Sequence, residues 1–332
     1  MKERIYLFDN LKATLIFLVV FAHFLSGVKQ NFDIVYSLHT FIYAFHMPCF
    51  LFVSGYFSKQ VAIDGKYKRT KIINYALIYL MAQIFLCIFT KSPIEVFMPK
   101  LAMWYLLVMI MAHLCIPYIS MLKPKFVFIT SIVLGLLACT DTIKFLSISR
   151  FLVFMPFFLL GYYLELDKIK KLFKKKYVVL SVISLIALLG FIHFSGLKRG
   201  IIQLFYGVIS YKDLTLDNMF VGIAVRMMYY LMAFYLIFAV LVLIPKGKNK
   251  FTKIGEKTLQ IYILHIPFVY VFLGTDNLIT NGYNFANCVN SPVELIVLLV
   301  LIFLFTLFLS LKIFSKPFDM IMKKDFMLKE KN

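Results

Sequence analysis

The sequence predicts an all-α integral membrane protein, a bundle of about ten transmembrane helices with both termini in the cytoplasm. Of its 332 residues, 62% are hydrophobic and only 16% are charged. A soluble domain of this composition would expose large apolar patches to water, whereas lipid is a suitable solvent for it. Apolar blocks recur from Leu11 to Ile313. We therefore expect a single membrane domain over residues 1–332, with no appended soluble domain.

Each apolar stretch long enough to cross a bilayer is expected to form a helix, because other open structures leave backbone hydrogen bonds unpaired in hydrocarbon. The fifth and sixth stretches together hold barely enough residues for two crossings, and only Asp141 and Lys144 interrupt them. The predicted spans are 11–28, 41–58, 72–90, 101–120, 127–140, 148–164, 177–195, 219–244, 258–274 and 292–314.

The positive charges orient these spans. With the N-terminus inside, the cytoplasmic segments hold about three quarters of the 36 lysines and arginines, as the positive-inside rule requires. The net charge of +20 therefore reflects topology and attraction to anionic lipid head groups, and no nucleic-acid partner is expected. We expect a multi-pass protein of the cell membrane, in a bacterial cytoplasmic membrane. No cysteine and histidine spacing suggests a metal site.

His23, His46, His113 and His265 fall within predicted spans, where an ionisable group costs a few kcal/mol and points to function. His23 stands eleven residues beyond Lys12, or roughly 16 Å along a helix. It is either a neutral side chain hydrogen-bonded across the bundle or a general base. His46 lies early in the inward-running second span and reaches a similar depth. His113 has mainly a structural role, and His265 precedes Pro267, which loosens its helix.

A polar cluster of Arg4, Asp9 and Lys12 opens the first helix, and the next cytoplasmic loop adds Lys68 and Arg69. Charges at helix ends usually anchor a protein at the membrane interface. At the entrance of a histidine-bearing cavity, the same charges suit the phosphates of a donor such as coenzyme A.

Five segments, taken together in their order along the chain, resemble the sequence motifs of a known family. They are Arg4-Ile-Tyr-Leu-Phe-Asp9-Asn10-Leu-Lys12 with the following Leu-Val-Val-Phe-Ala-His23, then Phe45-His46-Met47-Pro48-Cys-Phe-Leu-Phe-Val-Ser54-Gly55-Tyr56, Met103-Trp104-Tyr105-Leu106, Arg150 with Met155-Pro156-Phe-Phe-Leu-Leu-Gly161-Tyr162, and Ile254-Gly255-Glu-Lys-Thr258-Leu-Gln-Ile-Tyr262-Ile-Leu-His265. Together they resemble the membrane-bound acyltransferase 3 family, in its fucose 4-O-acetylase-like branch. The sequence departs from the family pattern at Lys12, where many members have arginine.

The resemblance implies an O-acyltransferase, in particular an O-acetyltransferase. Such a protein moves an acyl group from cytoplasmic acetyl-CoA or another acyl-CoA to a hydroxyl of a cell-envelope or exported sugar. The acceptor is a glycan or a lipid-linked sugar, and no metal is required. The implied roles are catalysis by His23 and His46, donor binding by Arg4, Asp9, Lys12, Lys68 and Arg69, and an acceptor side formed by Trp104, Arg150, Arg226 and His265. His23 would act as the base, with His46 orienting it or sharing its proton, although an acyl-histidine intermediate on His23 is equally compatible with the sequence.

Two other functions are compatible with a polytopic chain. A transporter or flippase also places histidines and arginines within its spans, but it is expected to show paired broken helices in its two halves. The second span, with Pro48 and Gly55, has no clear counterpart in the other half. A non-catalytic receptor or assembly protein does not need histidines within its spans together with basic residues at the cytoplasmic entrance.

Overall fold

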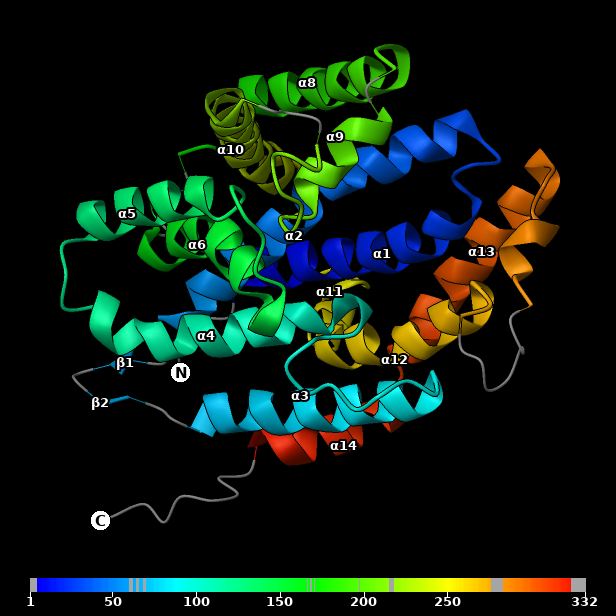
Figure 1. Ribbon diagram of the computed structural model, residues 1–332, viewed down its shortest axis with the longest axis horizontal. Helices are drawn as coiled ribbons and strands as arrows, with labels where there is room; N and C mark the ends of the chain where they lie inside the picture. The colour runs from blue at the N-terminus through cyan, green and yellow to red at the C-terminus, as the bar shows by residue number, and fades with distance from the viewer. Residues whose placement is uncertain are drawn as a thin grey trace.

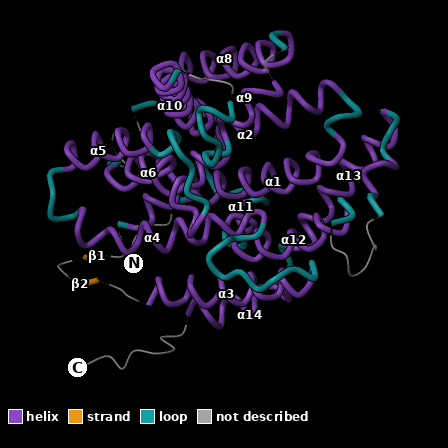
Figure 2. The backbone as a smooth tube through the Cα atoms, in the orientation of Figure 1, coloured by secondary structure: helices purple, strands orange, loops and turns teal. Residues whose placement is uncertain are grey.

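The computed structural model describes residues 5–323 except for 60–61, 64–65, 68–69, 166, 168, 170, 197, 215–217 and 276–282. Within these residues the protein is an all-α bundle, and the only extended segments are the two-residue strands β1 and β2 (Figure 2). The strands, β1 (Ala62–Ile63) and β2 (Lys66–Tyr67), pair antiparallel in the connection that follows the second helix.

Eight helices of the described chain are long and apolar enough to cross a membrane. They are α1 (Tyr6–Val28), α2 (Asp33–Ser58), α3 (Thr70–Phe89), α4 (Trp104–Ile119) with the preceding turn η1 (Leu101–Met103), α6 (Ile148–Tyr163) with the preceding turn η2 (Phe145–Ser147), α8 (Lys175–Phe194), α10 (Met219–Leu243) and α13 (Pro292–Leu309). Each overlaps a predicted span, although α1 and α2 begin earlier than predicted, at Tyr6 and Asp33. The prediction of an all-α membrane protein is therefore confirmed.

The other two predicted spans, 127–140 and 258–274, correspond to shorter helices. They are α5 (Pro124–Leu137), with 14 residues, and α12 (Thr258–Phe272), with 15. At 1.5 Å per residue, 14 or 15 residues rise only about 21–23 Å, less than the usual hydrocarbon thickness of about 30 Å. The total of ten spans therefore stays a prediction. The remaining helices for which the structure gives bounds are α9 (Lys198–Phe205), α11 (Thr252–Gly255), η3 (Phe285–Cys288) and α14 (Lys312–Lys323).

Helix α1 runs through the middle of the bundle, with α2 on one side and α12 and α13 on the other (Figure 1). A buried amide anchors its first turns. Asn10 donates from its Nδ2 to the carbonyls of Pro245 (2.7 Å) and Gly247 (2.8 Å), and its Oδ1 accepts from the Thr252 hydroxyl (2.6 Å). The start of α1 is thus tied to the connection between α10 and α11, which the charge pattern places on the same side of the membrane.

The far end of α1 is tied in the same way. Asn31, just beyond this helix, donates from its Nδ2 to the carbonyl of Val289 at 2.8 Å. Residue 289 precedes α13, so both ends of α1 are held by the C-terminal part of the chain. The predicted topology agrees with these contacts, because it places Asn10 and the α10–α11 connection on the cytoplasmic side and Asn31 and Val289 on the outer side.

The backbones of α2 and α6 touch at two glycines. A Cβ atom added at Gly55 would lie 1.9 Å from the carbonyl oxygen of Phe158, and one added at Gly161 would lie 1.8 Å from that of Phe52. Small residues allow this close approach, which is typical of helix packing in membranes. The contact positions His46 of α2 relative to Arg150 of α6.

We predict that Gly55→Ala lowers the stability of the protein, because the new methyl group overlaps the backbone of α6. Overpacking of this kind costs about 1–3 kcal/mol or more. The measurement is the midpoint of thermal unfolding in detergent. Gly190→Ala in α8 is the matched control, because a Cβ there meets no atom within 4 Å. Equal midpoints for the two variants would contradict the close packing of α2 on α6.

Candidate active site

Two histidines from helices far apart in the chain form a hydrogen-bonded pair. His23 Nδ1 of α1 lies 2.8 Å from His265 Nε2 of α12, and the two rings are nearly parallel, at 8°. His265 is fully buried, and its Nδ1 lies 2.9 Å from the carbonyl oxygen of Ile261. The pair crosses the bundle between the first and the ninth predicted span.

The partners of His265 assign the protons of this pair. A carbonyl oxygen only accepts, so His265 Nδ1 carries the proton in that bond, and the neutral ring then has a lone pair on Nε2. His23 must therefore donate from Nδ1 to His265, which leaves a lone pair on His23 Nε2. No described residue hydrogen-bonds this second nitrogen. A neutral imidazole with a free lone pair and a fixed orientation is equipped to act as a base.

His23 lines a cavity of about 440 Å³ in the half of the bundle away from Lys12. We call it the outer cavity. The described side chains that line it include aromatic, basic and hydroxyl groups but no carboxylate. They are Val19, His23, Ser26, Tyr43, His46, Met47, Pro99, Leu101, Ala102, Trp104, Arg150, Phe154, Phe205, Tyr206, Tyr262 and Val269. His265 supports the wall of this cavity from behind His23.

His46 lines the outer cavity as well. Its Nδ1 donates to the carbonyl oxygen of Ile42 at 2.8 Å. In the neutral ring the other nitrogen, Nε2, therefore carries no proton and can accept a hydrogen bond. The edge of its ring meets Tyr43, with centroids 4.8 Å apart. The predicted proximity of His23 and His46 thus takes the form of a shared cavity. The residue that hydrogen-bonds to His23 and orients it is His265.

Arg150 and Trp104 face each other across one wall. The guanidinium carbon lies 4.9 Å from the centre of the indole ring, and Trp104 stacks on Phe154 at 5.2 Å. Arg150 Nε donates to the carbonyl oxygen of Tyr206 at 3.1 Å. The guanidinium therefore has further donors for a ligand, and the indole stabilises its charge. Burial raises the pKa of the Tyr206 phenol, which keeps this group uncharged.

A second cavity, of about 230 Å³, lies along the same helices toward the first turns of α1. We call it the cytoplasmic cavity, after the side on which the charge pattern places it. Lys12 and Lys71 line it together with His113 and two hydroxyl groups of α2, those of Ser54 and Ser58. It combines positive charge at its mouth with polar and apolar walls, a composition that suits a phosphorylated ligand with a long, largely uncharged arm.

The predicted donor-binding residues divide into two groups. Asp9 and Lys12 form an ion pair at 2.9 Å at the first turns of α1, and Lys12 also faces the ring of Phe57 at 5.0 Å. Arg4, Lys68 and Arg69 lie outside the described residues. Of the five predicted residues, Lys12 is the one that the structure places in a cavity wall.

Arg226, predicted on the acceptor side, lines neither cavity. It is fully buried and donates to the carbonyl oxygen of Leu204 at 2.5 Å and to the Cys139 sulfur at 3.2 Å. Leu204 directly precedes Phe205 and Tyr206, which do line the outer cavity. Arg226 therefore supports the segment that carries these two aromatic residues and has no access to a ligand in the cavity.

Several residues that line the cavities were not among the predicted site residues. Tyr43, Tyr206 and Tyr262 line the outer cavity, and His113, interpreted as structural, lines the cytoplasmic one. His113 Nδ1 donates to the Met109 carbonyl at 2.6 Å. No single-residue pattern distinguishes these aromatic side chains from ordinary packing residues.

His39 was also missed, because the predicted second span begins at residue 41. It is fully buried, and neither ring nitrogen has a hydrogen-bond partner among the described residues. Its ring packs on Tyr43 at 4.5 Å. His39, Tyr43 and His46 have the spacing i, i+4, i+7, which places them on one face of a helix. This spacing is the feature of the sequence from which His39 could have been predicted to lie near His46.

The described residues contain no group of three or more histidine, cysteine, aspartate or glutamate side chains placed to hold a metal ion. Fold and site together define a multi-pass helical membrane protein with two internal cavities and a histidine pair beside one of them. Residues 5–311 match the family described as "Acyltransferase domain". The chain belongs to this acyltransferase 3 family, as predicted, and it is a membrane acyltransferase. No curated protein and no solved structure matches the chain.

We predict that Arg226→Met destabilises the protein. The substitution leaves the buried carbonyl of Leu204 without its donor, at a cost of about 1–3 kcal/mol. The measurement is again thermal unfolding in detergent, with exposed Lys125→Met as the control that removes a charge and no buried contact. A variant as stable as the control would show that Arg226 has no supporting role.

Proposed function

We propose that this protein is an O-acyltransferase that moves a short acyl group, in particular acetyl, from acyl-CoA in the cytoplasm to a hydroxyl of a cell-envelope or exported sugar. The observation that carries the proposal is the hydrogen bond between His23 and His265 beside the outer cavity. This hydrogen bond orients His23 as a base with a free lone pair on Nε2. The cytoplasmic cavity, lined by Lys12 and Lys71, lies along the same helices on the other side. The fucose 4-O-acetylase-like motifs favour a sugar as the acceptor.

The helices that line the cavities support a path between the two substrates. On α1, residues Lys12, Ile16, Val19 and His23 follow one another at intervals of three or four residues, so they share one face of the helix. This stripe runs from the cytoplasmic cavity to the outer cavity over roughly 16 Å. Lys12 and Lys71 would bind phosphates of the donor, while its thioester would reach toward His23.

In the proposed reaction, His23 Nε2 takes the proton of the acceptor hydroxyl as its oxygen attacks the thioester carbonyl. Donation from His23 Nδ1 to His265 stabilises the imidazolium that forms. The tetrahedral oxyanion collapses and breaks the carbon–sulfur bond, and the departing thiolate takes the proton from His23. The products are the acylated sugar and free coenzyme A, so that no other reactant is consumed.

The outer cavity offers groups for the remaining tasks. Arg150 has guanidinium donors directed toward a cavity without described carboxylates, which suits an oxyanion. Trp104, whose ring already contacts Arg150 and Phe154, would meet the sugar with the part of the indole that lines the cavity. His46, with its lone pair on Nε2, would accept a hydrogen bond from the acceptor. An acyl-histidine on His23 Nε2 would use the same lone pair.

We predict that His23→Ala abolishes acyl transfer. The experiment incubates purified protein in nanodiscs with radiolabelled acetyl-CoA and extracted envelope glycans, and follows thiol release and label on the glycans. Loss of a general base lowers the rate by about 10²–10⁴-fold, and His265→Ala is expected to have a smaller effect because it removes orientation alone. His193→Ala, outside both cavities, is the control.

The outcomes separate the candidate functions. Transfer that survives in His23→Ala would move the role of base to His46. The absence of donor binding and thiol release in folded wild-type protein would contradict the acyltransferase mechanism proposed for these cavities and favour a transporter. Label that remains on denatured protein in the absence of glycan would indicate the acyl-histidine route.

We predict that Lys12→Gln weakens donor binding and leaves the chemical step intact. A phosphate contact is made equally in the ground state and the transition state, so KM for acetyl-CoA should rise several-fold at an unchanged kcat. Steady-state kinetics at two salt concentrations measure the effect, with exposed Lys125→Gln as the control. An unchanged KM would remove Lys12 from the donor site.

A further inference from the structure

The two cavities meet at two side chains. Met47 of α2 and Tyr262 of α12 are the only described residues that line both the outer and the cytoplasmic cavity. Every other described lining residue belongs to one cavity alone. Met47 and Tyr262 therefore form a partition between the side on which Lys12 lies and the side on which His23 lies.

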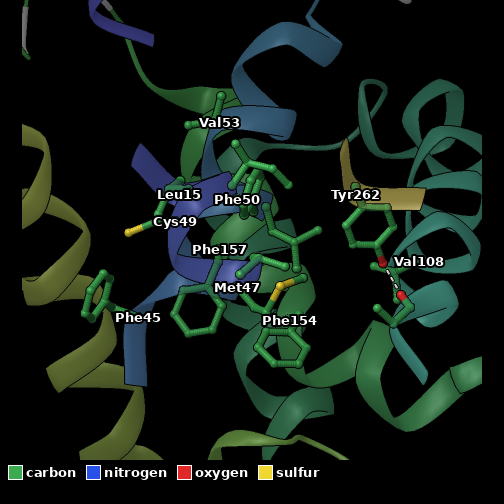
Figure 3. Close-up of a cluster of buried hydrophobic side chains, with 14 of the residues drawn as sticks. Leu15, Phe45, Met47, Cys49, Phe50, Val53, Val108, Phe154, Phe157 and Tyr262 are labelled. Carbon is green, nitrogen blue, oxygen red and sulfur yellow. Dashed lines mark hydrogen bonds between the residues drawn. The ribbon is translucent and has the colours of Figure 1, made fainter. Parts of the chain in front are cut away.

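Tyr262 is the fixed half of this partition. Its hydroxyl donates to the carbonyl oxygen of Ala102, the bond drawn as a dashed line in Figure 3. Its ring meets Tyr105 edge to face, with centroids 5.4 Å apart, and only 6% of the residue is exposed. Tyr105 is in turn hydrogen-bonded to Ser54 at 2.7 Å. A tyrosine held at its ring and at its hydroxyl does not move aside easily.

Met47 is the adaptable half. Its side chain is drawn within the buried apolar cluster, close to Phe154 (Figure 3), and 9% of the residue is exposed. Its side chain is unbranched and has three rotatable bonds, so it can change rotamer without displacing a hydrogen bond. An opening between the cavities is thus expected on the Met47 side.

The proposed reaction requires something to pass this partition. The charged mouth lies on one side and the oriented base on the other, so the thioester end of the donor must extend past Met47 and Tyr262 to meet His23. The outer cavity of about 440 Å³ then has to hold the acyl group and the reacting part of the acceptor together. This volume lies in the lower part of the usual range of about 300–1,000 Å³ for one ligand site.

We propose that the Met47–Tyr262 partition selects short acyl groups. This inference rests on the proposed function and deepens it by naming the side chains that select the acyl donor by its chain length. An acetyl group passes the partition and leaves room for the acceptor, whereas a longer chain is held at Met47 or fills the space that the acceptor needs. The partition also separates the cytoplasmic and outer cavities when no donor is bound.

The test compares acetyl-, butyryl- and hexanoyl-CoA in nanodiscs, by thiol release and by label transferred to envelope glycans. Wild-type protein should prefer acetyl-CoA. Met47→Ala should raise the butyryl-to-acetyl rate ratio at least tenfold, because it removes the movable side chain from the partition. Met47→Phe should block release from all three donors and still bind radiolabelled coenzyme A. Met155→Ala is the matched control, because Met155 is a buried methionine that lines neither the outer nor the cytoplasmic cavity.

The fluorescence of Trp104 provides a second measurement for the same test. Trp104 is the only tryptophan, and it lines the outer cavity and not the cytoplasmic one. Acetyl-CoA should change its fluorescence in the wild-type protein, as the acyl end arrives, and should leave it unchanged in Met47→Phe. Met47→Val provides a milder change should Met47→Ala fail to fold, and it should shift the ratio in the same direction.

The failure of this inference is distinguishable from the failure of the proposed function. Wild-type protein that neither binds coenzyme A nor releases thiol overturns the proposed function. Wild-type protein that transfers acetyl and hexanoyl groups equally well overturns the selection of short chains. A butyryl-to-acetyl ratio that is the same in Met47→Ala, Met155→Ala and the wild-type protein overturns the role of Met47.

Discussion

A histidine inside a membrane helix is tolerated only when its ring nitrogens find partners within the protein or in a water-filled cavity. The hydrogen bond between His23 and His265 meets this requirement for two helices at once, and it joins residues 242 positions apart. It sets α12 against α1, and the amides of Asn10 and Asn31 tie the two ends of α1 to the same C-terminal part of the chain. The cavities lie along the helices positioned in this way.

Close backbone packing between α2 and α6 forms the wall of the outer cavity that carries His46 and Arg150. The glycine contacts between α2 and α6 bring His46 and Arg150 to one cavity, and the buried guanidinium of Arg226 holds the segment that carries Tyr206. The site is therefore built on helices that have little freedom to shift. In the proposed function this rigidity keeps the base, the guanidinium and the aromatic face in place while the substrates arrive from opposite sides. Under the proposed selection of short acyl groups, Met47 is the side chain that changes rotamer to admit the donor.

Much of the fold was predictable because a membrane restricts the possibilities. The ten apolar stretches all correspond to helices, although α5 and α12, with 14 and 15 residues, are shorter than a bilayer crossing usually needs. The site was predictable in part. His23, His46, Trp104 and Arg150 line one cavity, and His265 is hydrogen-bonded to His23. Their polarity within apolar stretches marked the histidines and Arg150, whereas the family motif marked Trp104. Arg226 carried the same signal and yet lies outside the cavity, since a buried arginine is equally able to support backbone carbonyls.

The sequence by itself determined the helical membrane fold, the order of the spans and the family, because hydropathy, charge bias and ordered motifs are local properties of the chain. Only the tertiary structure decided which histidine orients His23, since the depth of a residue in its helix says nothing about which face it presents to a distant helix. The role of Met47 and Tyr262 also depends on tertiary structure. A partition between two cavities exists only once α2 and α12 are brought side by side.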